Sequence, residues 1–195
     1  MNKKGMSGIA IVLLLILGFI AISALSAVGT YNGLVAKDVT VENKWGNIQA
    51  SYERRLDLIP NLVATVKGSA AFEKDTQTQV TALRSGIQDA KTPGELEKYG
   101  ASVNKLVSGI IINVEAYPEL KSTEGFLALQ SQLEGTENRI NWDRDEYNTA
   151  VKNYKESVRR FPSNVIANMF NFNVEKWNMF EAEVSAENPP TVNFE

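Results

Sequence analysis

The chain has 195 residues, of which 44% are hydrophobic, and a formal net charge of -3, so its composition is globular with no strong charge bias. Without a basic surplus, nucleic acid is not an expected partner. The sequence has no cysteine and no histidine, which excludes disulfides, thiolate nucleophiles and imidazole ligands, and we expect no cofactor and no metal.

The first predicted element is a hydrophobic helix from about Gly5 to Val28, because no charged residue occurs between Gly5 and Ala36. About 20 apolar residues are enough to cross the roughly 30 Å hydrocarbon layer of a bilayer. We therefore assign residues 1–30 to a single-pass transmembrane anchor. The alternative is a cleaved signal peptide, but the apolar run is longer than the usual core of about 7–15 residues.

Basic residues on the two sides of this segment predict its orientation. Lys3 and Lys4, with the α-amino group, lie on one side, and Lys37 and Lys44 lie on the other. By the positive-inside rule, this slight excess favours an N-terminus in the cytoplasm and the remaining chain outside.

Residues 31–182 are predicted to form one helical bundle domain, followed by a flexible tail over residues 183–195, which contains Pro189 and Pro190. Apolar residues recur with heptad spacing from Tyr31 to Val66, with a companion row at Leu34, Val41, Ile48 and Leu62. This pattern predicts a helix that continues to about Asp89. Its junction with the anchor, at Gly29 and Gly33, is either a hinge or a continuous rod.

Two later helices have clear boundary signals. Thr92, Pro93 and Glu95 form a capping box that starts a helix ending near Tyr117 and Pro118. Ser122 or Thr123 caps the next, whose heptad row ends at Phe161 and Pro162, and Ser163 caps a short fourth helix. The predicted fold is all-α: an elongated antiparallel bundle of about four long helices, with coiled-coil-like spacing, attached to one N-terminal transmembrane helix.

Charged residues interrupt the apolar rows. Arg55 lies on the companion row of the first helix, and Asp143 lies on a row of the third, beside Glu137 and Arg144. Because an unpaired buried charge is costly, we expect Arg54 or Arg55, together with Asp57, to face Glu137, Asp143 or Arg144. One interpretation is a salt-bridge layer that sets the helix register; the other is a pocket for an anionic ligand or for catalysis. Trp142 lies off the core row and is a candidate for a contact surface.

Several blocks of sequence resemble the LemA family of membrane-anchored helical proteins of prokaryotes. They are residues 31–35 (YNGLV), 45–48 (WGNI), 54–63 (RRLDLIPNLV) and 116–121 (AYPELK), with Glu137, Arg144, Tyr147, Asn148, Phe161 and Pro162 further on. The resemblance implies a bundle on one membrane span, and a role in membrane organisation or internal-membrane biogenesis. It implies no catalytic residue. It transfers only motif positions of unassigned role: Arg54, Arg55, Asp57, Asn61, Glu137, Arg144 and Asn148.

These observations favour a non-enzymatic, membrane-tethered scaffold that self-associates or binds a membrane-protein partner in the cell membrane. The alternative is a tethered sensor that binds a small anion or peptide at the layer of arginines and carboxylates. A third reading, a hydrolase that uses those carboxylates, has no catalytic motif to support it.

Overall fold

The computed structural model describes residues 8–66, 70–115 and 123–181, and this part of the chain is helical without a strand. The helices are α1 (Gly8–Val66), α2 (Ala70–Asp89), α3 (Pro93–Glu115), α5 (Glu124–Arg159) and α6 (Ser163–Met169). The all-α prediction is confirmed. The predicted tail (183–195) and the 116–121 block lie outside the described residues.

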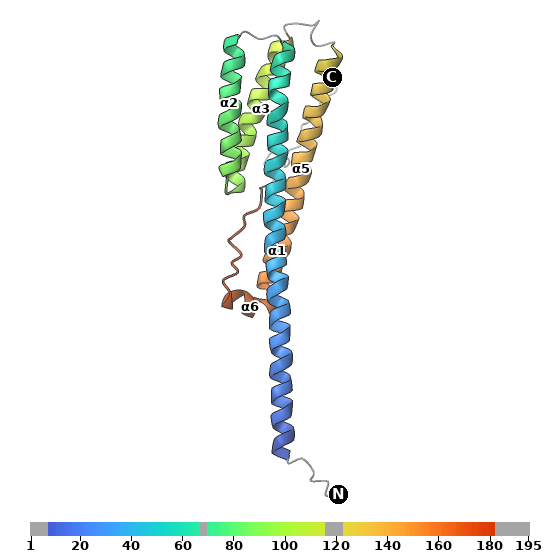
Figure 1. Cartoon of the computed structure of the whole chain (residues 1–195), viewed down its shortest axis with the longest axis vertical. Helices are drawn as coiled ribbons and strands as arrows, with labels where there is room; N and C mark the ends of the chain where they lie inside the picture. The colour runs from blue at the N-terminus through green and yellow to red at the C-terminus, as the bar shows by residue number, and fades with distance from the viewer. Residues whose placement is uncertain (1–7, 67–69, 116–122, 182–195) are drawn as a thin grey trace, which may run out of the picture.

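The long helix α1 is the axis of the molecule (Figure 1). Its 59 residues form a rod of about 90 Å at 1.5 Å per residue. The N-terminal part extends alone beyond the bundle, while the later part packs against α2, α3 and α5. Gly29 and Gly33 are both helical, so the junction between the two parts is a continuous rod rather than a hinge.

The isolated part of α1 has the length and composition of a membrane span. Its most apolar stretch has a mean hydropathy of 2.9, and none of that stretch is buried inside the protein. The apolar side chains from Ile9 to Val28 therefore point outward on all sides of the helix. Such a helix fits a hydrocarbon environment.

The bundle core follows the predicted rows. Leu34, Val41, Ile48 and Leu62 of α1 are all 2% exposed or less, and they meet the α5 row that contains Leu133, Ile140, Tyr147, Val151 and Tyr154. The capping box at the start of α3 is also formed. The amide of Glu95 donates to Oγ1 of Thr92, and the Glu95 carboxylate accepts from the amides of Lys91 and Thr92.

Two predicted boundaries were wrong. The helix expected to run on to Asp89 is two helices, because α1 ends at Val66 and α2 begins at Ala70 and packs back along α1. The apolar spacing continues from one helix to the next, so it does not indicate the break. The signal in the sequence is the pair Gly68 and Ser69, which are poor helix formers. Ser163 does not cap α6: it is the first helical residue, and Pro162 occupies the cap position.

After α6 the chain turns back in an irregular segment, residues 170–181, which we call the strap. Asn171 has a φ of 59°, a left-handed conformation that asparagine tolerates better than most residues. The amide of Phe172 bonds to the carbonyl of Ala167 and closes the end of α6. The strap then runs antiparallel to α5, beside α1.

Candidate functional site

Arg55 and Glu137 form an ion pair between α1 and α5, at the place where a charged layer was expected. The Arg55 side chain is 9% exposed and that of Glu137 is 40% exposed, so the pair lies at the edge of the core. Burial lowers the pKa of Arg55 from its usual value. Its Nε makes no hydrogen bond within the described residues, so the Glu137 carboxylate is the main group that stabilises its buried charge.

Asp143 is the other buried charge, with 2% exposure. It is held from both sides. Its carboxylate accepts a hydrogen bond of 2.6 Å from Oγ of Ser51 on α1, and Arg139 one turn earlier on α5 donates to both oxygens at 3.1 Å. Asp143 is therefore satisfied without an arginine from α1.

Of the two arginines considered, Arg55 faces α5 as expected, but the prediction that Asp57 faces α5 is wrong. Asp57 faces α2, where Arg84 lies 2.5 Å from its carboxylate, because it is on the other side of α1 from Arg55. Arg54 is exposed, and its Nε donates to the carbonyl of Ala50 in its own helix. Asn61, another of the motif positions, is exposed and lies outside the layer.

Arg144 also has a different partner from the one expected. Its guanidinium lies 3.1 Å from Glu97 of α3 and stacks over the ring of Phe180 in the strap, with 4.8 Å from its Cζ to the ring centroid. One side chain therefore joins α5, α3 and the strap. Next to it, burial is the main cause of the raised pKa of Tyr52, which Arg144 and Arg55 partly offset.

Asn148 holds the backbone of the strap. Its amide nitrogen donates to the Phe180 carbonyl at 3.2 Å, and its amide oxygen accepts from the Phe180 amide at 2.9 Å. The Phe180 ring is buried against Trp45 of α1 and Tyr147 of α5. Two motif positions, Arg144 and Asn148, thus converge on the same strap residue.

Further along, the strap is fastened by three more side chains of α1 and α5. The hydroxyls of Tyr147 and Tyr154 donate to the carbonyls of Asn178 and Asn173. Asp38 of α1 accepts 2.7 Å and 2.6 Å hydrogen bonds from Trp177 and Lys176. Burial raises the pKa of Tyr147 to about 12.

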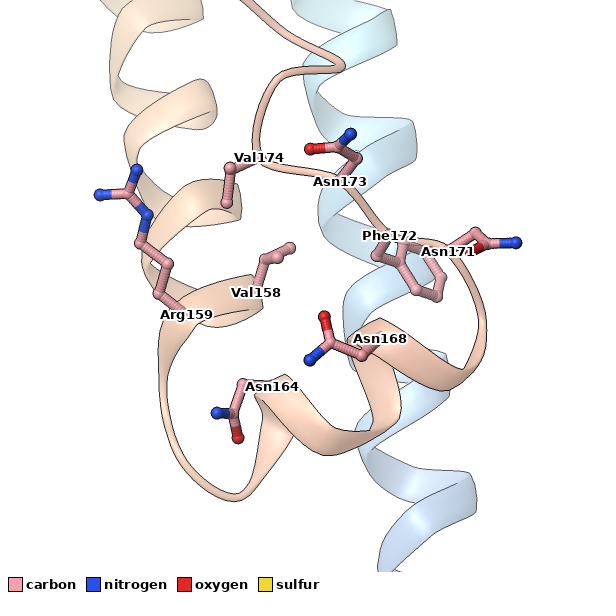
Figure 2. A pocket seen from close by; sticks show the side chains of 8 residues that line it. All are labelled: Val158, Arg159, Asn164, Asn168, Asn171, Phe172, Asn173 and Val174. Atoms are coloured by element: carbon pink, nitrogen blue, oxygen red, sulfur yellow. The ribbon is translucent and has the colours of Figure 1, made fainter.

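Two hollows border these contacts. A shallow groove of about 380 Å³ runs between α1 and α5, and its charged lining comes from Arg54 and Arg139 rather than from Arg55. A larger, polar hollow of about 790 Å³ lies where α5, α6 and the strap meet, and Figure 2 shows Arg159, Asn164, Asn168 and Asn173 around it. Within the described residues, no three carboxylates gather closely enough to hold a metal ion.

Sequence reasoning identified Asn148 as a motif position but not its role as a clamp on the strap. A usable signal was the run Tyr147 and Asn148, followed by Tyr154 one heptad later, because hydrogen-bonding side chains at buried positions need partners. The strap itself has no periodicity from which to predict its path.

The fold and its contacts define a helical bundle built on one long helix that also contains a candidate membrane span. The chain belongs to the LemA family, whose family model matches residues 44–194. It is 24% identical over 144 residues to Protein LemA of Metamycoplasma hominis, an alignment that covers 72% of this chain and 64% of that protein.

It is also similar to two magnetosome proteins. One is MamQ 2 of Paramagnetospirillum magneticum, with 24% identity over 70% of this chain and 60% of that protein. The other is MamQ of Magnetospirillum gryphiswaldense, with 24% identity over 78% of this chain and 68% of that protein. The chain matches less than two thirds of the length of the Metamycoplasma and Paramagnetospirillum proteins.

Proposed function

We propose that this chain is a membrane-anchored, non-enzymatic scaffold, in which α1 spans the bilayer once and carries the bundle as a rigid extension. The observation that carries the proposal is the continuity of α1 from Gly8 to Val66. The same helix is exposed and apolar in its first part and forms the bundle core in its second. A helix without a flexible joint transmits position and orientation from the membrane to the bundle.

The charged layer supports a structural role rather than ligand binding. Arg55 is paired with Glu137, Asp143 with Ser51 and Arg139, and Arg144 with Glu97. Each of these charges already has a partner within the chain, so an incoming anion would have to displace a carboxylate. These three ion-paired or hydrogen-bonded groups therefore give no support to the sensor hypothesis.

Self-association is the second part of the proposal. Trp142 of α5 is 55% exposed, and a large aromatic side chain of this kind is common at protein interfaces. Tethering to a membrane raises the effective concentration of neighbouring copies, so a small interface is enough to keep them together.

The absence of cysteine makes the test of self-association direct. Asp145→Cys, an exposed position one turn after Trp142, keeps the tryptophan and should give covalent pairs when intact membranes that contain the full chain are treated with a short bifunctional maleimide. The matched control is Ser85→Cys, an exposed residue on α2, which should give few pairs. Equal yields at the two positions, together with a lone protomer in detergent at micromolar concentration, would refute self-association through this face.

The Ser85→Cys variant also tests the orientation. We propose that the N-terminus is cytoplasmic and the bundle is outside, from the balance of Lys3 and Lys4 against Lys37 and Lys44. A membrane-impermeant maleimide should then label Ser85→Cys in intact cells. Labelling only after the cells are broken would reverse the orientation and leave the span itself in place.

A further inference from the structure

An exposed apolar patch lies at the corner where α5 turns into α6 and the strap. Phe161 is 78% exposed, Val165 50%, Met169 70% and Phe170 55%, all within a ten-residue segment. The other large exposed apolar side chains of the described bundle are spread over α1, α3, α5 and the strap: Tyr31, Val39, Ile112, Leu127, Trp142 and Met179. A concentration of this kind on a folded protein marks a contact surface.

The position of the corner along α1 indicates what it contacts. A hydrocarbon layer of about 30 Å corresponds to about 20 helical residues, which takes the span from Ile9 to about Val28. Tyr31 is three residues further, about 4.5 Å along the axis, at the depth of the lipid headgroups. The ring of Tyr31 lies 4.8 Å from that of Phe170 and 5.7 Å from that of Phe172, so the corner is at the same depth.

The direction of α6 fits a membrane surface. Figures 1 and 2 show α6 lying across α1 rather than along it, so it is roughly parallel to the bilayer when α1 crosses. Val165 and Met169 are four residues apart and share the outer face, while Ala167 is fully buried against the bundle. A helix that lies in the interface with one apolar face outward is a known mode of membrane attachment.

Polar groups beside the patch match the chemistry of phospholipid headgroups. Arg159 and Arg160 are exposed in the residues that immediately precede Phe161. Arg159 borders the polar hollow with Asn164 and Asn168, and its side chain points back along α5, which leaves Arg160 as the arginine next to the patch (Figure 2). Guanidinium groups bind phosphate oxygens, and amides bind phosphate or hydroxyl oxygens.

We propose that this corner, residues 159–170, is a second membrane contact that rests on the headgroup region of the leaflet from which α1 emerges. Phe161, Val165, Met169 and Phe170 enter the interface, and Arg160 binds lipid phosphates. A span alone leaves α1 and its bundle free to tilt relative to the bilayer, and a second contact beside the span limits that tilt. This inference rests on the proposed span of α1.

The test uses the full chain with one cysteine at a time, labelled with bimane and reconstituted into phosphatidylcholine vesicles that contain phosphatidylglycerol. The quenchers are lipids brominated either near the headgroup or deep in the acyl chain. Leu17→Cys reports the span, Met169→Cys reports the corner, and Ile112→Cys is the matched control. Ile112 is also a large exposed apolar residue, at 64%, but lies near the far end of α3.

We expect deep bromines to quench the Leu17 probe, shallow bromines to quench the Met169 probe, and neither to quench the Ile112 probe. Quenching at Leu17 with none at Met169 would overturn the second contact and leave the span intact. Absence of quenching at Leu17 would overturn the span, and the corner contact with it. Quenching at all three positions would mean that the whole bundle lies on the membrane, which also contradicts a contact confined to the corner.

A charge variant separates membrane contact from local folding. Val165→Glu combined with Met169→Glu adds two charges to exposed positions, so the melting temperature of the bundle should be unchanged. A bimane probe at Phe170→Cys in this background should lose its shallow quenching, down to the level of the Ile112 probe. Undiminished quenching with a normal melt would overturn the role of these side chains.

Discussion

Arg55 is the residue at which the stability of the bundle depends most on a single partner. Its side chain is 9% exposed, and Glu137 supplies the opposing charge from α5. A buried charge that loses its partner costs more than the pair contributes as a whole. Asp143 is also a buried charge, but two side chains stabilise its carboxylate, Ser51 and Arg139, so it depends less on either one.

Glu137→Gln should therefore lower the free energy of unfolding by about 1–3 kcal/mol, because Arg55 stays buried without its counter-charge. Adding Arg55→Met should restore most of the loss. Glu134→Gln, an exposed position one turn earlier, is the control and should change stability by less than about 0.5 kcal/mol. Denaturant melts of the full chain in detergent measure all three. A Glu137→Gln protein with unchanged stability would contradict the dependence of the bundle on this ion pair.

Tyr147 makes the attachment of the strap sensitive to high pH. Burial raises its pKa from the usual 10.0 to about 12, and its hydroxyl donates to Asn178. Because the folded protein holds this proton more tightly than the unfolded chain does, the stabilising contribution of Tyr147 is complete below pH 10. It is lost as the pH rises from 10 towards 12.

The wild-type chain should therefore lose stability over this pH range more steeply than Tyr147→Phe, which has no phenol to ionise. At pH 8 the variant should be less stable than the wild type by about 0.5–1.5 kcal/mol, the usual value of one hydrogen bond. Urea melts at a series of pH values compare the two proteins. Parallel pH profiles would show that Tyr147 is not the group responsible.

At the scale of elements, two glycines set how closely the helices approach. A Cβ added at Gly100 of α3 would lie 2.5 Å from the hydroxyl of Tyr52, and one added at Gly86 of α2 would lie 2.3 Å from the ring of Tyr99. The first contact lies in the core, because Tyr52 is 5% exposed. Here glycine is needed for space rather than for its backbone freedom.

Gly100→Ala should destabilise the bundle by about 1–3 kcal/mol, because Tyr52 must leave its position between α1 and α3. The control is Gly109→Ala in the same helix, where an added Cβ meets nothing within 4 Å. That change should stabilise the protein by about 0.5–1 kcal/mol through the better helix propensity of alanine. Thermal melts of the two variants should move in opposite directions, and a shift in the same direction would contradict the packing of α3 on α1.

The elements also show what could and could not be predicted from sequence. Heptad rows identified the buried faces of α1 and α5, and the capping box located the start of α3, because these signals are local. The end of α1 at Val66 and the start of α2 at Ala70 were missed because apolar spacing continues from one helix to the next. Asp57 was assigned to the wrong neighbour because periodicity shows which face of a helix a residue occupies but not which helix lies opposite.

The strap was beyond prediction for a different reason. Its position depends on side chains of α1 and α5 that bind its backbone, such as Asn148 at Phe180, and on the burial of one aromatic ring. Contacts of this type link residues 19 to 139 positions apart and leave no repeat in the sequence. The role of Tyr147, Asn148 and Tyr154 in binding the strap is therefore visible only when the path of the strap is known.

At the scale of the whole molecule, α1 joins the candidate membrane span to the helical bundle in one helix of 59 residues. α5 and α6 return the chain to the level of Tyr31, close to the end of the apolar stretch. The molecule therefore has a distal end, formed by the ends of α1, α2, α3 and α5, and a proximal end at the corner (Figure 1). The proposed contacts with lipid lie at the proximal end, and the proposed contacts between copies lie along the sides.

The most direct measurement is alkaline carbonate extraction of cell membranes that contain the full chain, followed by intact mass analysis of the protein in each fraction. The account predicts that the protein stays in the membrane pellet with the apolar segment before Tyr31 still attached, because that segment is more stable in hydrocarbon than in water. A protein recovered in the supernatant, with its mass reduced by that segment, would contradict the account.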